Sequence, residues 1–175
     1  MHTTTHNAAR EAVMAKPCLA QLVLQAEDDT EALRTVLRAY RAIETLMAYA
    51  THPHAAVSGD ELAALLLVHN RAMDIRLHAL AAKIETVHTT LRACASDGPA
   101  APLALQAIDH LENLRGVREA YGALQSLVPY AEHTTGDDLS AALQMLNEAM
   151  TEHTAQMDDK LDALHAALVS QGTAA

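Results

Sequence analysis

The chain contains the stretch LRTVLRAYRAIETLMAYATH at residues 33–52 and the related stretch LRGVREAYGALQSLVPYAEH at residues 114–133. They align at an offset of 81 and share ten of their twenty positions. A second pair, residues 59–91 and 136–168, aligns at an offset of 77 and shares eleven of 33 positions. Because all four tyrosines fall at equivalent positions, we infer that the chain holds two copies of one unit.

Each copy has the composition and periodicity of a helical hairpin. Half of the residues are hydrophobic, mainly the strong helix formers Ala and Leu, and the chain has neither Phe nor Trp. Apolar residues recur at spacings of three and four, which is typical of one helix face. Because one hairpin cannot bury its apolar stripe alone, we expect the two copies to pack together. The sequence therefore predicts an all-α protein, an up-and-down antiparallel four-helix bundle made of two tandem hairpin repeats.

Breaks in the apolar pattern divide the chain. We expect an N-terminal arm at 1–16, repeat 1 at 17–95 and repeat 2 at 102–170, with both repeats in one domain. The third helix should be kinked or ended early by Pro129. Within the repeats, helices are expected at about residues 17–50, 60–94, 102–131 and 137–169.

The second helix of each repeat has a recognisable start. Ser58 with Glu61, and Thr135 with Asp138, have the spacing of a capping box. In this motif each side chain accepts a hydrogen bond from the backbone N–H of the other residue. We therefore expect these caps just before the helices that start at about residues 60 and 137.

Three side chains with polar atoms fall in the predicted apolar stripe. Tyr40 and Tyr121 occupy equivalent positions, and each hydroxyl needs a hydrogen-bond partner if it is buried. His69 falls in the stripe of the second helix and is expected to be a hydrogen-bonded core residue.

The formal net charge of −10 limits the classes of partner. Nucleic acids and anionic membrane surfaces attract Lys and Arg, so neither is expected as a partner. No apolar run approaches the ~20 residues of a membrane span. The expected location is cytoplasmic.

Carboxylates and histidines form the pattern of a di-metal site. The second and fourth helices each carry a carboxylate-x-x-His, whose spacing puts both groups on one helix face. The first and third helices each carry one carboxylate at an equivalent position. This is the ligand set of di-iron carboxylate bundles, and it indicates iron, manganese or zinc as an alternative cofactor. The alternative without a metal is that the carboxylates and histidines form solvent-facing pairs on the helix surfaces. The set consists of Glu31, Glu85, His88, Glu112, Asp162 and His165.

The sequence shows no Gly-rich phosphate loop, no Ser-His-Asp order and no zinc-type cysteine spacing, so no catalytic residue or resident cofactor is predicted. The leading expectation is a small acidic, non-enzymatic interaction protein, an adaptor, regulator or inhibitor. It would bind a protein partner through a helix face, with Tyr49 and Tyr130 as contact residues, and homodimerisation is a further expectation. The alternatives are the metal storage or oxidase-like bundle and a pH-responsive module driven by the eleven histidines.

Overall fold

The computed structural model describes residues 3–49, 57–94, 98–130 and 135–173, with side chains from residue 19 to residue 171 outside the gaps. These residues contain helices and no β-strand, so the predicted all-α class is confirmed. The elements are α1 (Thr3–Tyr49), α2 (Gly59–Ala93), α3 (Ala100–Leu127), the 3-10 turn η1 (Val128–Tyr130) and α4 (Gly136–Thr173).

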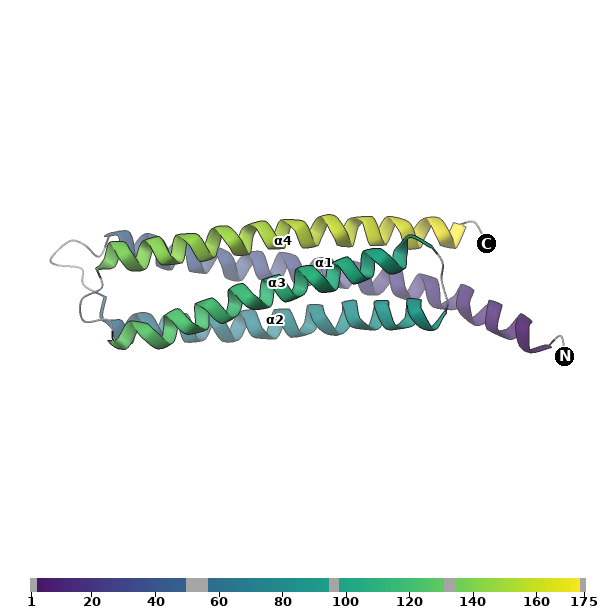
Figure 1. Cartoon of the computed structure of the whole chain (residues 1–175), viewed down its shortest axis with the longest axis horizontal. Helices are drawn as coiled ribbons and strands as arrows, with labels where there is room; N and C mark the ends of the chain where they lie inside the picture. The colour runs from purple at the N-terminus through teal and green to yellow at the C-terminus, as the bar shows by residue number, and fades with distance from the viewer. Residues whose placement is uncertain (1–2, 50–56, 95–97, 131–134, 174–175) are drawn as a thin grey trace.

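The four helices lie side by side in an elongated bundle (Figure 1). Each helix packs along its length against two neighbours, in the ring order α1, α2, α3, α4 and back to α1. Among the described residues, the backbones of diagonally opposite helices do not come as close to each other. Helices that follow each other in the sequence run antiparallel, as expected for short connections (Figure 1). No helix within the described ranges is long and apolar enough to cross a membrane.

Two helices are longer than predicted. The expected start of the first helix at Pro17 is wrong, because α1 begins at Thr3 and runs through the stretch expected to be an arm. Residues 8–16 include four alanines, which favour helix, and Pro17 lies inside α1 instead of at its first turn. The first turns of α1 project beyond the other helices (Figure 1). Similarly, α4 continues to Thr173.

The predicted helix boundaries in the middle of the chain agree with the structure. Ser58 and Glu61 form both bonds of a capping box at the start of α2. Thr135 and Asp138 make the equivalent pair of bonds, at 3.0 and 3.2 Å. Helix α3 ends at Leu127, and Pro129 lies in the 3-10 turn, because proline cannot donate a backbone hydrogen bond to continue the helix.

The core contains a polar residue that the sequence pattern did not predict. On α2 the buried side chain is Asn70, while its neighbour His69 is only partly buried, so the assignment of His69 to the core is wrong. The hydroxyl of Tyr40 donates to Asn70 Oδ1 at 2.5 Å. Asn70 Nδ2 then donates to Gln125 Oε1 at 2.7 Å. This chain of hydrogen bonds joins α1, α2 and α3.

An equivalent chain joins α3, α4 and α1. The hydroxyl of Tyr121 donates to Asn147 Oδ1 at 2.6 Å, and Asn147 Nδ2 donates to Glu44 Oε2 at 2.6 Å. The ring of Tyr121 lies against the ring of Tyr40, with centroids 4.2 Å apart and planes tilted by 33°. Burial raises the pKa of both tyrosines, so each hydroxyl keeps its proton and remains a donor.

These contacts lie at matching positions of the predicted repeats. Tyr40 corresponds to Tyr121, Asn70 to Asn147, and Glu44 to Gln125. In each of the two series of hydrogen bonds, the tyrosine and the asparagine belong to one hairpin, while the last acceptor belongs to the other hairpin. The two hairpins are therefore fastened to each other through the centre of the bundle. The residues of this polar centre are Tyr40, Glu44, Asn70, Tyr121, Gln125 and Asn147.

We predict that Tyr121→Phe lowers the free energy of unfolding by about 1–3 kcal/mol, because Asn147 Oδ1 loses its buried donor. Tyr40→Phe should have a similar effect through Asn70. Tyr49→Phe is the matched control, since this tyrosine is 67% exposed, and its effect should stay within about 0.5 kcal/mol. Urea unfolding followed by circular dichroism measures all three. Equal stability of Tyr121→Phe and Tyr49→Phe would contradict a stabilising role for the polar centre.

Candidate functional site

The first and third helices hold the carboxylates of the predicted metal set in ion pairs. Glu31 accepts hydrogen bonds from Arg34 and Arg38 at 3.1 and 3.0 Å. The hydrogen bond from Arg34 is the main cause that lowers the pKa of Glu31. Glu112 pairs with Arg115 at 2.5 Å. Both carboxylates are mostly solvent-exposed, and each is already paired with arginine on its own helix.

The carboxylate-histidine pairs of the other two helices lie at the surface. Glu85 and Asp162 are exposed, while His88 and His165 are partly buried. Across the described part of the chain, no three His, Cys, Asp or Glu side chains are close enough to hold a metal ion. The structure does not bring the six candidate ligands together, and the di-metal alternative stays a prediction.

One carboxylate absent from the predicted set does face this region. Glu27 on α1 interacts electrostatically with Asp162 and His165 of α4. Its Oε1 atom is buried and has no hydrogen-bond partner in the described structure. Burial raises the pKa of Glu27, and the negative charge of Asp162 raises it further, while His165 opposes both. The equivalent position of the second repeat holds Ile108. This difference between the repeats is the signal in the sequence for a partly buried carboxylate at residue 27.

Other charged groups between helices are paired. Thr30 and Arg34 on α1 both contact the carboxylate of Asp158 on α4. Lys83 on α2 pairs with Asp29 on α1. These contacts link neighbouring helices along the bundle, which indicates a structural role.

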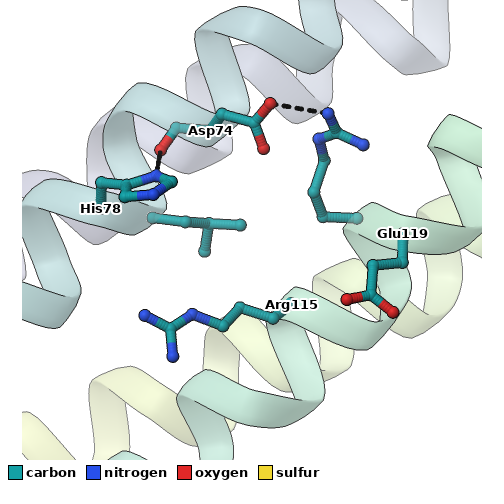
Figure 2. A pocket seen from close by; sticks show the side chains of 6 residues that line it. Asp74, His78, Arg115 and Glu119 are labelled. Atoms are coloured by element: carbon teal, nitrogen blue, oxygen red, sulfur yellow. Dashed lines mark hydrogen bonds and ion pairs between the residues drawn. The ribbon is translucent and has the colours of Figure 1, made fainter.

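A surface pocket of about 240 Å³ lies between α2 and α3 (Figure 2). Its polar groups are partly engaged already: Arg118 pairs with Asp74 at 2.6 Å, and His78 Nδ1 lies 2.7 Å from the carbonyl oxygen of Asp74. Arg115 and Glu119 extend from α3 and are not directed at each other (Figure 2). The volume is below the ~300–1,000 Å³ of typical ligand sites. This geometry provides no nucleophile beside a base.

The predicted contact residues Tyr49 and Tyr130 lie at the same end of the bundle, where α1 and η1 finish (Figure 1). Their side chains are 67% and 83% exposed. Four other large apolar side chains near this end are more than half exposed. We call the whole set the loop-end surface, and it consists of Leu46, Tyr49, Val68, Leu127, Tyr130 and Met145.

The histidine-driven alternative is not tested by these contacts. His69 Nδ1 lies 2.7 Å from the carbonyl oxygen of Leu65, and the His69 ring meets Tyr40 edge-on at 5.6 Å. His52, His54 and His133 lie outside the described residues. The pH-responsive module therefore stays a prediction.

We predict that Glu27→Ile raises the melting temperature at pH 7 by about 2–4 °C, as expected for roughly 1 kcal/mol in a chain of this size. The raised pKa means that protonation of Glu27 stabilises the fold. This stabilisation is complete below the ordinary pKa of 4.5 and is lost as pH rises through the folded-state pKa. The advantage of the variant should thus shrink at about pH 4.

Thermal unfolding at the two pH values tests this prediction. Glu85→Ile is the matched control, because Glu85 is exposed on α2 and should give no comparable pH-dependent gain. A Glu27→Ile variant less stable than the wild type at pH 7 would show that Glu27 has a compensating partner.

Comparisons with known proteins leave the function to be inferred from these residues. No protein family, no curated protein and no solved structure matches the chain.

Proposed function

We propose that this protein is a non-enzymatic interaction module that binds a protein partner with its loop-end surface. The observation that carries the proposal is that the exposed apolar residues occur in equivalent pairs. Leu127 corresponds to Leu46 and Tyr130 to Tyr49. The third pair is Val68 and Met145. Isolated exposed apolar residues are ordinary, but a repeated set at one end of a bundle is not.

The types of residue on this surface suit protein binding. Tyrosine supplies a large apolar contact with few rotatable bonds, and it is enriched among the residues that dominate binding energy. Met145 adds a flexible side chain that adapts to a partner's shape. Because these side chains are already exposed, a partner can cover them without opening the core.

The charge around the loop-end surface indicates the chemistry of the partner. Residues 42–49, 57–70, 120–130 and 135–147 contain five carboxylates and neither Lys nor Arg. A partner segment that combines apolar and basic side chains would therefore match this end of the bundle in both respects. The carboxylates are Glu44, Asp60, Glu61, Asp137 and Asp138.

We predict that the double variant Tyr49→Ser/Tyr130→Ser loses partner capture. Proteins retained from the native lysate by immobilised wild type would be quantified by mass spectrometry. At least one should fall about tenfold or more with the variant, since truncating a central aromatic residue typically costs 2 kcal/mol or more.

The control is Leu24→Ser/Leu105→Ser, an equivalent pair of exposed leucines toward the other end of the bundle. It replaces exposed apolar side chains away from the loop-end surface and should retain the partner. Circular dichroism must show the same helix content for all three proteins. If the wild type and both variants capture the same proteins in the same amounts, the loop-end surface is not the binding site.

A further inference from the structure

A pocket of about 140 Å³ between α1 and α4 is lined by three arginines of one helix. Arg34, Arg38 and Arg41 follow each other at spacings of four and three, so they project from the same face of α1. The chain has only twelve Lys and Arg residues in total, so three of them at one pocket concentrate positive charge there. We call this the α1–α4 pocket, and its other lining residues are Leu37, Thr151 and Thr154.

Two of the three arginines already bind carboxylates of the bundle, to different extents. Arg34 donates to Glu31 at 3.1 Å and also pairs with Asp158 across the boundary between the helices. Arg38 donates to the same Glu31 at 3.0 Å, and its side chain is 66% exposed. Because a guanidinium has five N–H donors, Arg38 keeps donors that a ligand can reach from solvent.

The third arginine, Arg41, is held in place by an uncharged group. It donates to Thr151 Oγ1 at 2.8 Å. The hydroxyl of Thr151 in turn donates to the carbonyl oxygen of Asn147 at 2.5 Å. Arg41 forms no ion pair with any residue that the structure describes. These bonds therefore orient the guanidinium without neutralising its positive charge.

The pocket between α2 and α3 (Figure 2) is the counterpart of the α1–α4 pocket. Five lining positions of one pocket correspond to five lining positions of the other in the predicted repeats. The matching pairs are Arg34/Arg115, Leu37/Arg118, Arg38/Glu119, Thr151/Asp74 and Thr154/Leu77. The two pockets can therefore be compared position by position.

The counterpart pocket supplies its own carboxylates where the α1–α4 pocket has none. Asp74 pairs with Arg118 at 2.6 Å, and Glu119 adds a second carboxylate to the lining. The matching residues of the α1–α4 pocket are the uncharged Thr151 and the positively charged Arg38. With ion-pair partners included, three arginines meet two carboxylates in the α1–α4 pocket, while two arginines meet three carboxylates in its counterpart. Of the two, the α1–α4 pocket has the excess of positive charge.

Carboxylates elsewhere on the chain do not remove this excess. Glu148 and Glu152 are exposed on α4 but do not line the pocket, and they accept hydrogen bonds from Gln144 and Gln156 at 2.9 and 3.1 Å. At physiological salt the screening length is ~8 Å. The groups that line the pocket therefore act on a bound ion more strongly than the net charge of −10 does.

The size and the donors of the pocket suit a phosphate group. A volume of 140 Å³ corresponds to about four to five water molecules at ~30 Å³ each, and a phosphate group has five heavy atoms. The planar fork of arginine matches phosphate oxygens and can bind two of them at once. Because phosphate has more oxygens than a carboxylate, it can bond to two guanidinium groups at the same time.

We propose that the α1–α4 pocket binds a phosphate group through the guanidinium groups of Arg38 and Arg41. The phosphate can be the free ion or the end of a small phosphomonoester, because both present the same oxygens to the arginines. In the second case the rest of the molecule extends into solvent. The site lies outside the loop-end surface, so it does not rest on the function proposed above.

The test is an NMR titration of the isotope-labelled protein with inorganic phosphate at pH 7 and low salt. The side-chain N–H signals of Arg38 and Arg41 should shift saturably, with a Kd of about 1 mM or lower. The variant Arg38→Gln/Arg41→Gln should raise this Kd about tenfold or more, because it removes the charge-assisted hydrogen bonds. Backbone signals report binding by the variant.

Two further variants separate the site from general effects of charge and folding. Thr151→Asp keeps all three arginines but adds the carboxylate that Asp74 supplies in the counterpart pocket, so it should weaken phosphate binding as well. Arg115→Gln is the matched control, because Arg115 lines the counterpart pocket and its loss should leave the Kd unchanged. Should the double variant lose helix content by circular dichroism, Thr151→Asp provides the comparison.

Titrations with methyl phosphate and acetate identify the ligand chemistry. Methyl phosphate that binds as tightly as inorganic phosphate assigns the site to phosphomonoesters, while much weaker binding assigns it to the free ion, and either result supports a phosphate site. Acetate that binds as tightly as phosphate would overturn the proposal. So would the absence of saturable shifts up to about 10 mM phosphate, or an unchanged Kd in both Arg38→Gln/Arg41→Gln and Thr151→Asp.

Discussion

The arrangement of the whole bundle depends on two buried tyrosines whose hydroxyl groups must be satisfied. Tyr40 and Tyr121 lie against each other in the centre, where water cannot solvate them. Each donates to an asparagine on the following helix. An unpaired buried hydroxyl or amide would cost several times what the bond itself contributes, so other registers of the helices are disfavoured. Ala- and Leu-rich stripes alone would not discriminate among registers in this way, because a shift by one turn again pairs apolar with apolar residues.

A fixed register has consequences for every surface of the molecule. Once the polar centre sets the heights of the helices, Arg118 lies level with Asp74, and Arg41 lies level with Thr151. The Lys83–Asp29 pair and the contacts of Asp158 then extend the same arrangement toward the other end. A side chain on the surface therefore has a defined position relative to side chains on neighbouring helices. Recognition of a partner through several helices at once requires such defined positions.

Much of this architecture could be predicted from the sequence because it depends on local patterns. Helix content follows from Ala and Leu, the helix start at Ser58 from a capping box, and the end of α3 from Pro129. The choice of Asn70 over His69 could not be predicted, because adjacent positions near the edge of a stripe differ by only 100° in direction and tertiary contacts decide between them. The sequence also could not predict which charged side chains meet groups on a neighbouring helix. Glu31 pairs with arginines on its own helix, while Glu27, one turn earlier, faces α4.

The two hairpins share the residues that folding requires and differ at many positions of their surfaces. At the polar centre the two matched tyrosines are identical and so are the two matched asparagines, since a buried tyrosine or asparagine can be replaced only at the cost of an unpaired partner. At outward positions such a replacement costs little stability, so the residues of the two hairpins can differ freely. The exposed apolar pairs at the loop end nevertheless match. Folding stability does not account for this match, because these apolar side chains are exposed. The proposed binding of a protein partner accounts for this match, because the matched apolar sets provide two equivalent contacts for a partner.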